Sequence, residues 1–369
     1  MEVRNLSINW KIGVEVELLA PKGMSRYDLA EAIACEHKGT IRHFFYPQVE
    51  PSKVEGKPIF NNLTLAFEIL DSSGKVIAQC VDDLTLQDDC DKSHPPKNGW
   101  YRIVSDEPRL LQLIMQQCNP AASVIDVLKP IARLFGTEIE HGQGGMIRVA
   151  DRTGSAIAIA APLPGERERP CELITPPIEN DHLKRLEALL SIARSLGFTA
   201  PNEGATHIHF DAKLLESTST LTNLVRLLWE FDVELGKLVK TNPNCRRLGK
   251  WSLEFYNWVQ KPDFYNQPWL EAKRSLSKFE ITKYCDFNLK NFIHPVSDKY
   301  TFEVRIFPVW LDGHSVIEVA GLFEGILYWA INSPVDSKMP ASLSELLNEL
   351  PISKNLYEIW QNRLMRDLN

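Results

Sequence analysis

Acidic, histidine and arginine side chains alternate with apolar residues in three segments of this chain. The alternation gives three pairs of ionisable residues: Glu15 with Glu17, His207 with His209, and Glu303 with Arg305. Side chains two residues apart on a β-strand project from the same face. If these segments are strands, each one presents two ionisable groups on one face and apolar side chains on the other.

A fourth segment adds a single carboxylate. Glu172 lies in the apolar sequence 171–177, which ends in two prolines. An ordinary sheet with one solvated face produces the same alternation, and two histidines on a strand are often a surface pair. The residue types favour a cleft instead, because exposed strands commonly carry lysine, threonine and serine rather than glutamate, histidine and arginine.

A shared cleft would bring four carboxylates together, those of Glu15, Glu17, Glu172 and Glu303. Two carboxylates about 5 Å apart repel each other by about 3 kcal/mol at an effective dielectric constant of about 20. Such a group needs either raised pKa values or bound divalent cations, and its oxygens suit Mg²⁺ or Mn²⁺. Arg305 would add a fork-shaped cation suited to phosphate, so the pattern points to a site for metal and nucleotide.

Strands are predicted wherever these residues lie, and further elements surround them. The predicted strands span residues 11–20, 63–70, 75–81, 137–140, 146–150, 155–161, 171–175, 206–211 and 300–310. The predicted helices span residues 25–37, 107–118, 121–135, 181–196, 221–239, 314–332, 342–350 and 355–368. Strands in unequal, adjacent groups favour an α+β protein with a largely antiparallel sheet over a repeating βαβ pattern.

Two helical regions carry further expectations. The most apolar segment, residues 316–331, is interrupted by Glu318 and Glu324, which predicts a buried helix rather than a membrane span. The last two helices follow Pro334 and Pro340. They either pack against the rest of the chain or serve a partner, and the sequence leaves both alternatives open.

Composition limits the classes of protein that the chain can represent. Its 369 residues suffice for one large domain or two modest ones, and 41 basic against 48 acidic residues give a net charge of −7. This acidic balance argues against a nucleic-acid-coating protein, which needs a basic face. Seven scattered cysteines without a CxxC spacing indicate reduced thiols, and the polar N-terminus lacks the apolar core of a signal peptide. We therefore expect a cytoplasmic protein that binds neither nucleic acid nor membrane.

Together these segments resemble the amidoligases, relatives of glutamine synthetase and glutamate–cysteine ligase. Residues 13–17 (GVEVE) are similar to the family's first strand, 172–178 (ELITPPI) to its ElvSPP element, 206–209 (THIH) to its GxHxH strand, and 302–307 (FEVRIF) to its final strand. The order and rough spacing agree. Residues 242–247 (NPNCRR) resemble a loop in which the family places an arginine, and Phe287-Asn288 resembles a segment before the last strand. Two departures are that Thr206 replaces the usual glycine and that residues 39–133 have no counterpart.

The resemblance implies a glutamine synthetase-type fold, in which a curved, mostly antiparallel sheet flanked by helices holds ATP and Mg²⁺ or Mn²⁺. It implies a catalytic domain over residues 1–334, with 39–133 as a possible elaboration, and a C-terminal helical extension over 335–369. The implied metal ligands are Glu15, Glu17, Glu172, His207 and Glu303. Arg305 and Asn288 would contact the nucleotide, Arg246 or Arg247 would contact phosphate or a substrate carboxylate, and His209 would face the substrate or act as a base.

The implied activity is ATP-dependent joining of a carboxylate to an amine through an acyl phosphate. The substrates would be a small-molecule or peptide carboxylate and an amine, and a homo-oligomer is compatible with this function. The absence of Walker A and GxGxxG sequences fits a sheet-based nucleotide site. The residues also leave open a metal-dependent hydrolase of amides or phosphate esters, and a binding protein without catalytic activity.

Overall fold

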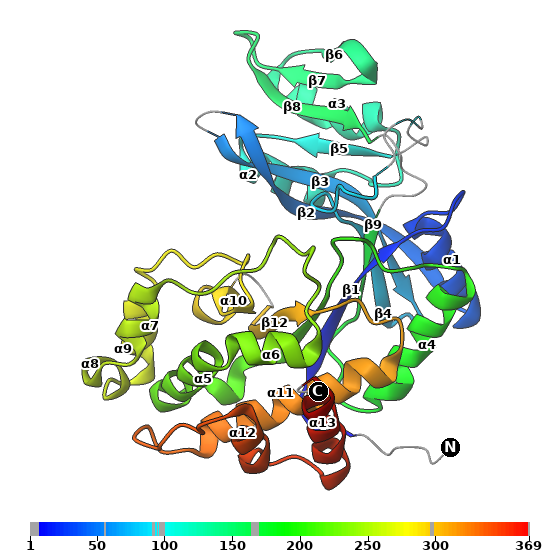
Figure 1. The fold of residues 1–369 in the computed structure, drawn as a ribbon. Helices are drawn as coiled ribbons and strands as arrows, with labels where there is room; N and C mark the ends of the chain where they lie inside the picture. The colour runs from blue at the N-terminus through cyan, green and yellow to red at the C-terminus, as the bar shows by residue number, and fades with distance from the viewer. Residues whose placement is uncertain are drawn as a thin grey trace. The chain divides into compact units, whose positions relative to one another are not determined.

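A computed structural model gives the fold (Figure 1). It describes residues 7–54, 57–90, 93, 95, 100–163, 170–295 and 299–367. The N-terminal segment, which we expect not to be a signal peptide, includes residues 1–6. These six residues lie outside the described range. The chain divides into two compact units: unit 1 is Met1–Val16, Pro177–Ser191 and Glu203–Asn369, and unit 2 is Glu17–Pro176 and Ile192–Asn202. The strand β1 (Ile12–Leu19) and the helix α4 (His182–Ser195) have residues in both units.

Unit 1 is built on a short antiparallel sheet. Its strands lie in the order β11 (Phe287–Asn288), β12 (Thr301–Phe307), β10 (Thr206–Asp211) and β1. The apolar side chains of these strands are fully buried; they include Val14, Ile208, Phe302 and Val304. Alternation along β10 and β12 therefore directs one set of side chains into the core and leaves the other set, which carries the ionisable residues, for the opposite face.

The helix α11 (Gly313–Asn332) forms the centre of unit 1 together with α5 (Thr218–Glu230). It is long and apolar enough to cross a membrane, but 78% of its apolar window is buried inside the protein, as expected of a core helix. Its two acidic residues have partners. Glu324 accepts hydrogen bonds from the backbone N–H groups of Asn9 and Trp10, both at 2.7 Å, and Glu318 pairs with Arg363.

The C-terminal helices α12 (Leu343–Glu349) and α13 (Lys354–Asp367) pack within unit 1. Trp360 of α13 is completely buried, and its indole N–H donates to the carbonyl of Glu318 at 3.3 Å. Leu356 lies so close to Gly321 that a Cβ on this glycine would come within 2.7 Å of it. Of the two alternatives for these helices, the structure supports packing against the chain's own core.

The prediction of one helix over residues 221–239 is wrong. Two helices, α5 and α6 (Asp232–Val239), meet at Phe231, whose φ of −101° and ψ of 10° depart from helical values. Phe231 donates to Leu227 and accepts from Leu235, so backbone hydrogen bonding continues through the bend. The next elements along the chain are short: α7 (Leu253–Val259), α8 (Pro262–Tyr265), α9 (Trp269–Leu276) and α10 (Lys290–Ile293).

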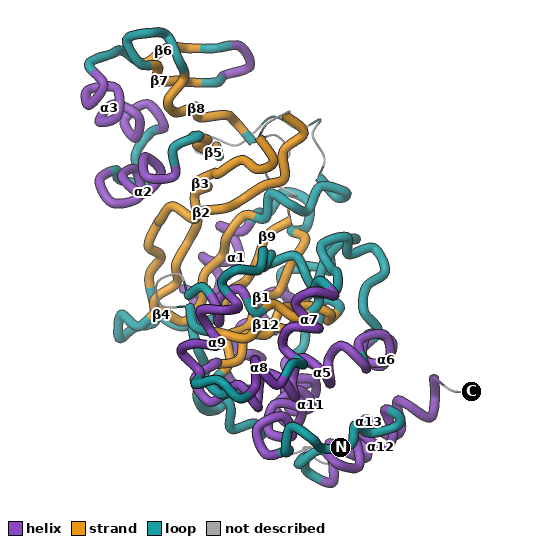
Figure 2. The backbone as a smooth tube through the Cα atoms, turned by 90° about the vertical axis from the view of Figure 1, so that its left-hand side faces the viewer, coloured by secondary structure: helices purple, strands orange, loops and turns teal. Residues whose placement is uncertain are grey.

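Unit 2 contains most of the strands, drawn in orange in Figure 2. Their order is β9 (Pro170–Ile174), β4 (Val76–Asp82), β3 (Lys57–Leu70), β5 (Tyr101–Val104), β8 (Ala156–Pro162), β7 (Ile147–Ala150) and β6 (Ile139–His141), and β2 (Thr40–Val54) also pairs with β3. Its helices are α1 (Arg26–Glu36), α2 (Pro108–Gln117) and α3 (Val124–Phe135). Ile114 and Leu128 of the last two helices pack with Ile103 of β5 in one apolar core.

The paired strands described above are antiparallel within each unit, and helices flank them. The α+β class with a largely antiparallel sheet is therefore confirmed. The first predicted helix begins as a helix should, because Ser25 and Asp28 form a capping box at the start of α1. The glutamine synthetase-type arrangement stays an expectation from the resemblance.

Gly39 joins α1 to β2 and permits a close backbone approach. A Cβ at this position would lie 1.8 Å from the carbonyl oxygen of Leu70. We predict that Gly39→Ala lowers the free energy of unfolding by about 2–3 kcal/mol, because the backbone must shift to relieve the clash. Gly74→Ala is the control: Gly74 has a φ of +80°, but a Cβ there would meet no atom within 4 Å, so only about 1 kcal/mol should be lost. Equal midpoints for both variants in urea denaturation would contradict the prediction.

Candidate functional site

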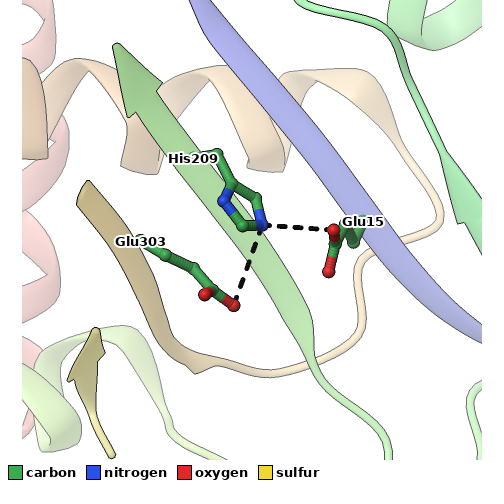
Figure 3. A group of neighbouring side chains, drawn as sticks. All are labelled: Glu15, His209 and Glu303. Atoms are coloured by element: carbon green, nitrogen blue, oxygen red, sulfur yellow. Dashed lines mark ion pairs between the residues drawn. The ribbon is translucent and has the colours of Figure 1, made fainter. Parts of the chain in front are cut away.

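Three neighbouring strands of unit 1 bring ionisable side chains onto one face of the sheet. Glu15 of β1 lies directly opposite His207 of β10, and His209 lies opposite Glu303 of β12. Cross-strand partners point to the same side of an antiparallel pair. Figure 3 shows His209 with its imidazole between the carboxylates of Glu15 and Glu303. We call Glu15, His207, His209, Glu303 and Arg305 together the unit 1 group.

The distances within the unit 1 group are short. Nε2 of His209 lies 3.2 Å from Oε1 of Glu15 and 3.7 Å from Oε1 of Glu303. Nδ1 of His207 lies 3.5 Å from Oε2 of Glu15 and 3.7 Å from Oε1 of Glu303. One ligand atom each from Glu15, His209 and Glu303 falls within 4.8 Å of the others, which is the spacing of donors around a single cation.

Both carboxylate oxygens of Glu303 accept a hydrogen bond. Nη1 of Arg305 donates to Oε1 and Nδ2 of Asn288 donates to Oε2, both at 2.6 Å. The register between β10 and β12 shifts here. The step of two residues from Thr206 to Ile208 on β10 lies opposite the step of three residues from Phe307 to Val304 on β12. Bulges of this kind re-aim side chains and are frequent beside active sites. On the other side of β12 the N–H of Arg305 bonds to the carbonyl of Asp286 at 2.9 Å, which continues the pairing with β11.

The polar face of these strands is buried. The exposed fraction is 2% for His207, 8% for His209, 3% for Glu303 and 6% for Arg305. An ordinary solvated sheet face would leave such residues open to water. That alternative reading of the alternation is therefore wrong for β10 and β12.

The surrounding charges keep the carboxylates ionised. Burial alone would raise the pKa of Glu303, but the charges of Arg305 and the two histidines outweigh it and lower this pKa to about 2. The pKa of Glu15 is likewise held well below its ordinary value, because His209 and its neighbours overcome the effect of burial. Burial lowers the pKa of His209, yet the charges of Glu303 and Glu15 raise it overall. Lys299, 3.6 Å from Glu15, adds a further positive charge.

The unit 1 group fits a divalent cation. Two ionised carboxylates and one imidazole are a donor set that Mg²⁺ and Mn²⁺ accept, Mn²⁺ more readily. Nε2 of His209 is buried and makes no hydrogen bond of acceptable geometry, although two carboxylates lie near it. A cation among these atoms would replace the proton that the two carboxylates favour on His209 and would give this nitrogen a partner.

A second acidic group lies in unit 2. One carboxylate oxygen each from Glu17, Asp83 and Glu172 falls within 4.8 Å of the others, and Glu17 and Asp83 are buried. We call these residues the unit 2 group. Val81 pairs with Glu172 across β4 and β9, so the residues that follow Val81 lie beside β9. Three hard oxygen donors so close together also suit a divalent cation, and each pair of charges would repel by about 3–4 kcal/mol without one.

Asp83 is the functional candidate that sequence reasoning missed. It follows the end of β4 by one residue, and its Oδ1 accepts from the N–H and hydroxyl of Thr85 at 2.8 and 2.6 Å. Its neighbour Asp82 is buried 3.3 Å from Arg26. The only signal in the sequence was a pair of aspartates directly after an apolar strand. Lys299 was also missed, because a lone lysine in a loop carries no pattern.

The predicted residues thus fall into two places. Unit 1 gathers Glu15, His207, His209, Asn288, Glu303 and Arg305, whereas Glu17 and Glu172 belong to the unit 2 group. The loop between α6 and α7 carries Arg246, which is exposed, and Arg247, which is half-buried. Asn242 begins this loop and donates to the carbonyl of Gly204, two residues before β10, at 2.9 Å. The roles of the two loop arginines stay predictions.

Comparison with known proteins identifies the family. Residues 8–322 match the model of a family described as "putative amidoligase enzyme". Because the match covers most of the chain, the chain belongs to this family, and the resemblance noted in the sequence is confirmed. The family description indicates a ligase-type enzyme. A search of curated proteins found no significant match.

Removal of one carboxylate should weaken metal binding. We predict that Glu303→Gln lowers the affinity for Mn²⁺ at least about tenfold, or about 1.4 kcal/mol, because a neutral amide oxygen is a poorer ligand than a carboxylate. Isothermal titration calorimetry on the full chain measures this. Glu254→Gln, at an exposed position of α7, is the matched control. Unchanged affinity in Glu303→Gln would remove Glu303 from the ligand set.

The lowered pKa of Glu303 also predicts a pH dependence of stability. A carboxyl group whose pKa is lower in the folded protein stabilises the fold above its ordinary pKa of 4.5, and this contribution is lost as the pH falls towards about 2. The free energy of unfolding of the wild type should therefore fall between pH 4.5 and 2 more steeply than that of Glu303→Gln. Parallel curves from denaturant titrations at each pH would show that Glu303 is not stabilised in its ionised form.

Proposed function

We propose that this protein is an ATP-dependent ligase that joins a carboxylate to an amine through an acyl phosphate. The observation that carries the proposal is the unit 1 group, in which ionised carboxylates, an imidazole and a guanidinium are buried together on three adjacent strands. Membership of the amidoligase family supports a ligase rather than a hydrolase. The identity of the nucleotide, the metal and the intermediate is part of the proposal.

The proposal contains two sets of three residues, and each set would hold one cation. Glu15, His209 and Glu303 would hold one cation, and Glu17, Asp83 and Glu172 another. Strand β1 supplies one carboxylate to each set. When bound, Mg²⁺ or Mn²⁺ neutralises charge on the nucleotide phosphates. In this assignment His209 replaces His207 as the imidazole ligand, because Nδ1 of His207 faces the guanidinium of Arg305 at 3.5 Å.

Two positively charged side chains, those of Arg305 and Lys299, lie beside the carboxylates of the unit 1 group. Arg305 is held by Glu303 through one of its nitrogens, Nη1, and a guanidinium presents five N–H groups in a rigid fork. It is therefore oriented by a buried partner before any substrate binds. We assign Arg305 to stabilising the charge on the transferred phosphoryl group, in line with the role of arginine in other phosphoryl transfers.

The reaction needs activation because a carboxylate is a poor electrophile. In the first step a carboxylate oxygen of the acid attacks the γ-phosphorus of ATP, the bond from this phosphorus to the β–γ bridging oxygen breaks, and ADP leaves. In the second step the amine nitrogen attacks the carbonyl carbon of the acyl phosphate. The bond to the phosphate oxygen breaks, inorganic phosphate leaves, and the nitrogen loses a proton. A carboxylate oxygen of the site that is not bound to a cation would receive this proton.

The direct test is release of ADP from ATP and Mg²⁺ or Mn²⁺ in a screen of acid and amine pairs. We predict that release requires both co-substrates and that Glu303→Gln and Arg305→Gln each lower kcat about 100-fold or more, because each removes charge that acts in the transition state. Glu254→Gln should retain wild-type activity, since this position is exposed.

Two other outcomes separate the alternatives. Metal-dependent cleavage of an amide or phosphate ester without ATP would support a hydrolase. Full ADP release in Glu303→Gln and Arg305→Gln would show that the unit 1 group is not the catalytic site, whatever the reaction.

A further inference from the structure

A basic pocket lies in unit 1 among residues that have no part in the unit 1 group. It has a volume of about 290 Å³ and is formed by the end of α6, the segment after β12, and α13. Lys240, Arg363 and Arg366 line it, together with Trp310. No acidic side chain is among its lining residues in the described part of the chain. Arg363 pairs with Glu318, and Lys240 and Arg366 add two further positive charges around this small space, which favours an anionic occupant.

Lys240 occupies a position where a lysine is unusual. It ends α6 with a φ of +60°, and its N–H bonds to the carbonyls of Gly236 and Lys237. Helices that end in this left-handed conformation usually have glycine there, because a Cβ makes the conformation unfavourable. The chain therefore carries a positive charge at this point at a conformational cost.

Buried groups fix the position of Arg363. It pairs with Glu318 of α11, and its guanidinium lies 4.5 Å from the ring centroid of the buried Trp360. The pairing uses one nitrogen, Nη2, and leaves the guanidinium with further N–H donors. Arg366 lies one helical turn further along α13 and is exposed. The two arginines therefore present their charges on the same face of the helix.

Trp310 forms a rigid wall of the pocket. Its ring stacks on Phe307 with centroids 5.6 Å apart, and its backbone N–H donates to the hydroxyl of Thr206 at 3.1 Å. The pocket is smaller than most sites for drug-sized ligands, which begin at about 300 Å³. Size and charge together select a small anion with more than one negative charge.

We infer that this basic pocket binds a small, multiply charged anion of the phosphate class. Arginine forks match phosphate oxygens, and a dianion neutralises several of the pocket's charges at once, whereas a single carboxylate neutralises one. The inference does not depend on the proposed ligase activity, because none of the pocket's residues belongs to the unit 1 or unit 2 group.

The test is a titration of the full chain with pyrophosphate at constant ionic strength, followed by tryptophan fluorescence and calorimetry. EDTA is present throughout and ATP is absent, so that no cation bridges the anion to the acidic groups. We expect saturable binding that weakens with added salt and follows the order pyrophosphate, orthophosphate, acetate. Arg366→Gln should weaken the affinity about tenfold, and Lys354→Gln, at a highly exposed position of the same helix, should not.

Lys240→Gly separates binding from folding. Glycine suits the left-handed conformation, so this variant should have a higher Tm than the wild type, while its affinity for pyrophosphate falls about tenfold. A residue with a purely structural role would not move these two quantities in opposite directions.

Three results would overturn the inference: no saturable binding at millimolar pyrophosphate, equal affinity for acetate, or unchanged affinity in both Arg366→Gln and Lys240→Gly. ADP-forming activity is measured separately on the same variants. Failure of the ligase assay with intact pyrophosphate binding would leave this inference standing, and the reverse result would leave the proposed function standing.

Discussion

A buried carboxylate is stable only where positive charge or hydrogen-bond donors face it, and this constraint organises unit 1 around Glu303. Both of its oxygens are occupied, one by Arg305 and the other by Asn288. Arg305 lies on β12 and Asn288 on β11, so both partners reach Glu303 only when these two strands pair in the observed register. The result is a carboxylate that stays ionised although only 3% of the residue is exposed.

The apolar face of the same strands provides the foundation. Phe302 and Val304 alternate with Glu303 along β12, and both are completely buried. Phe323 of α11 contacts Phe307 at the end of this strand, with ring centroids 5.3 Å apart. A shift of β12 by one residue would send Glu303 into the apolar core, so hydrophobic packing fixes the position of the charged groups. Stability and site geometry in unit 1 thus have a common origin.

Alternation on a strand is a local property, so the sequence alone predicts which residues share a face. Glu303 is paired with Arg305 in this way, and His207 with His209. The same pattern does not reveal Asp83, since the proximity of this residue to Glu17 and Glu172 depends on strand pairing distant in sequence. The division of the acidic residues into two groups depends on the same long-range pairing.

Errors in the predicted elements also have physical causes. The helical spacing of apolar residues continues through Phe231, so the sequence does not reveal the bend between α5 and α6. Strand β2 was missed because Pro47 and Pro51 interrupt its sequence. Proline lacks an N–H to donate and is tolerated on a strand whose second edge is unpaired. Among the described strands β2 pairs with β3 alone, which explains how it accommodates both prolines.

The central claim is that the two acidic groups are cation sites. Crystals of the full chain grown with Mn²⁺, and diffraction data collected at the manganese absorption edge, test it most directly. The account predicts one anomalous peak in direct contact with Glu15, His209 and Glu303, and a second in contact with Glu17, Asp83 and Glu172. Absence of a peak at both groups, at millimolar Mn²⁺ and with ordered side chains, would contradict it.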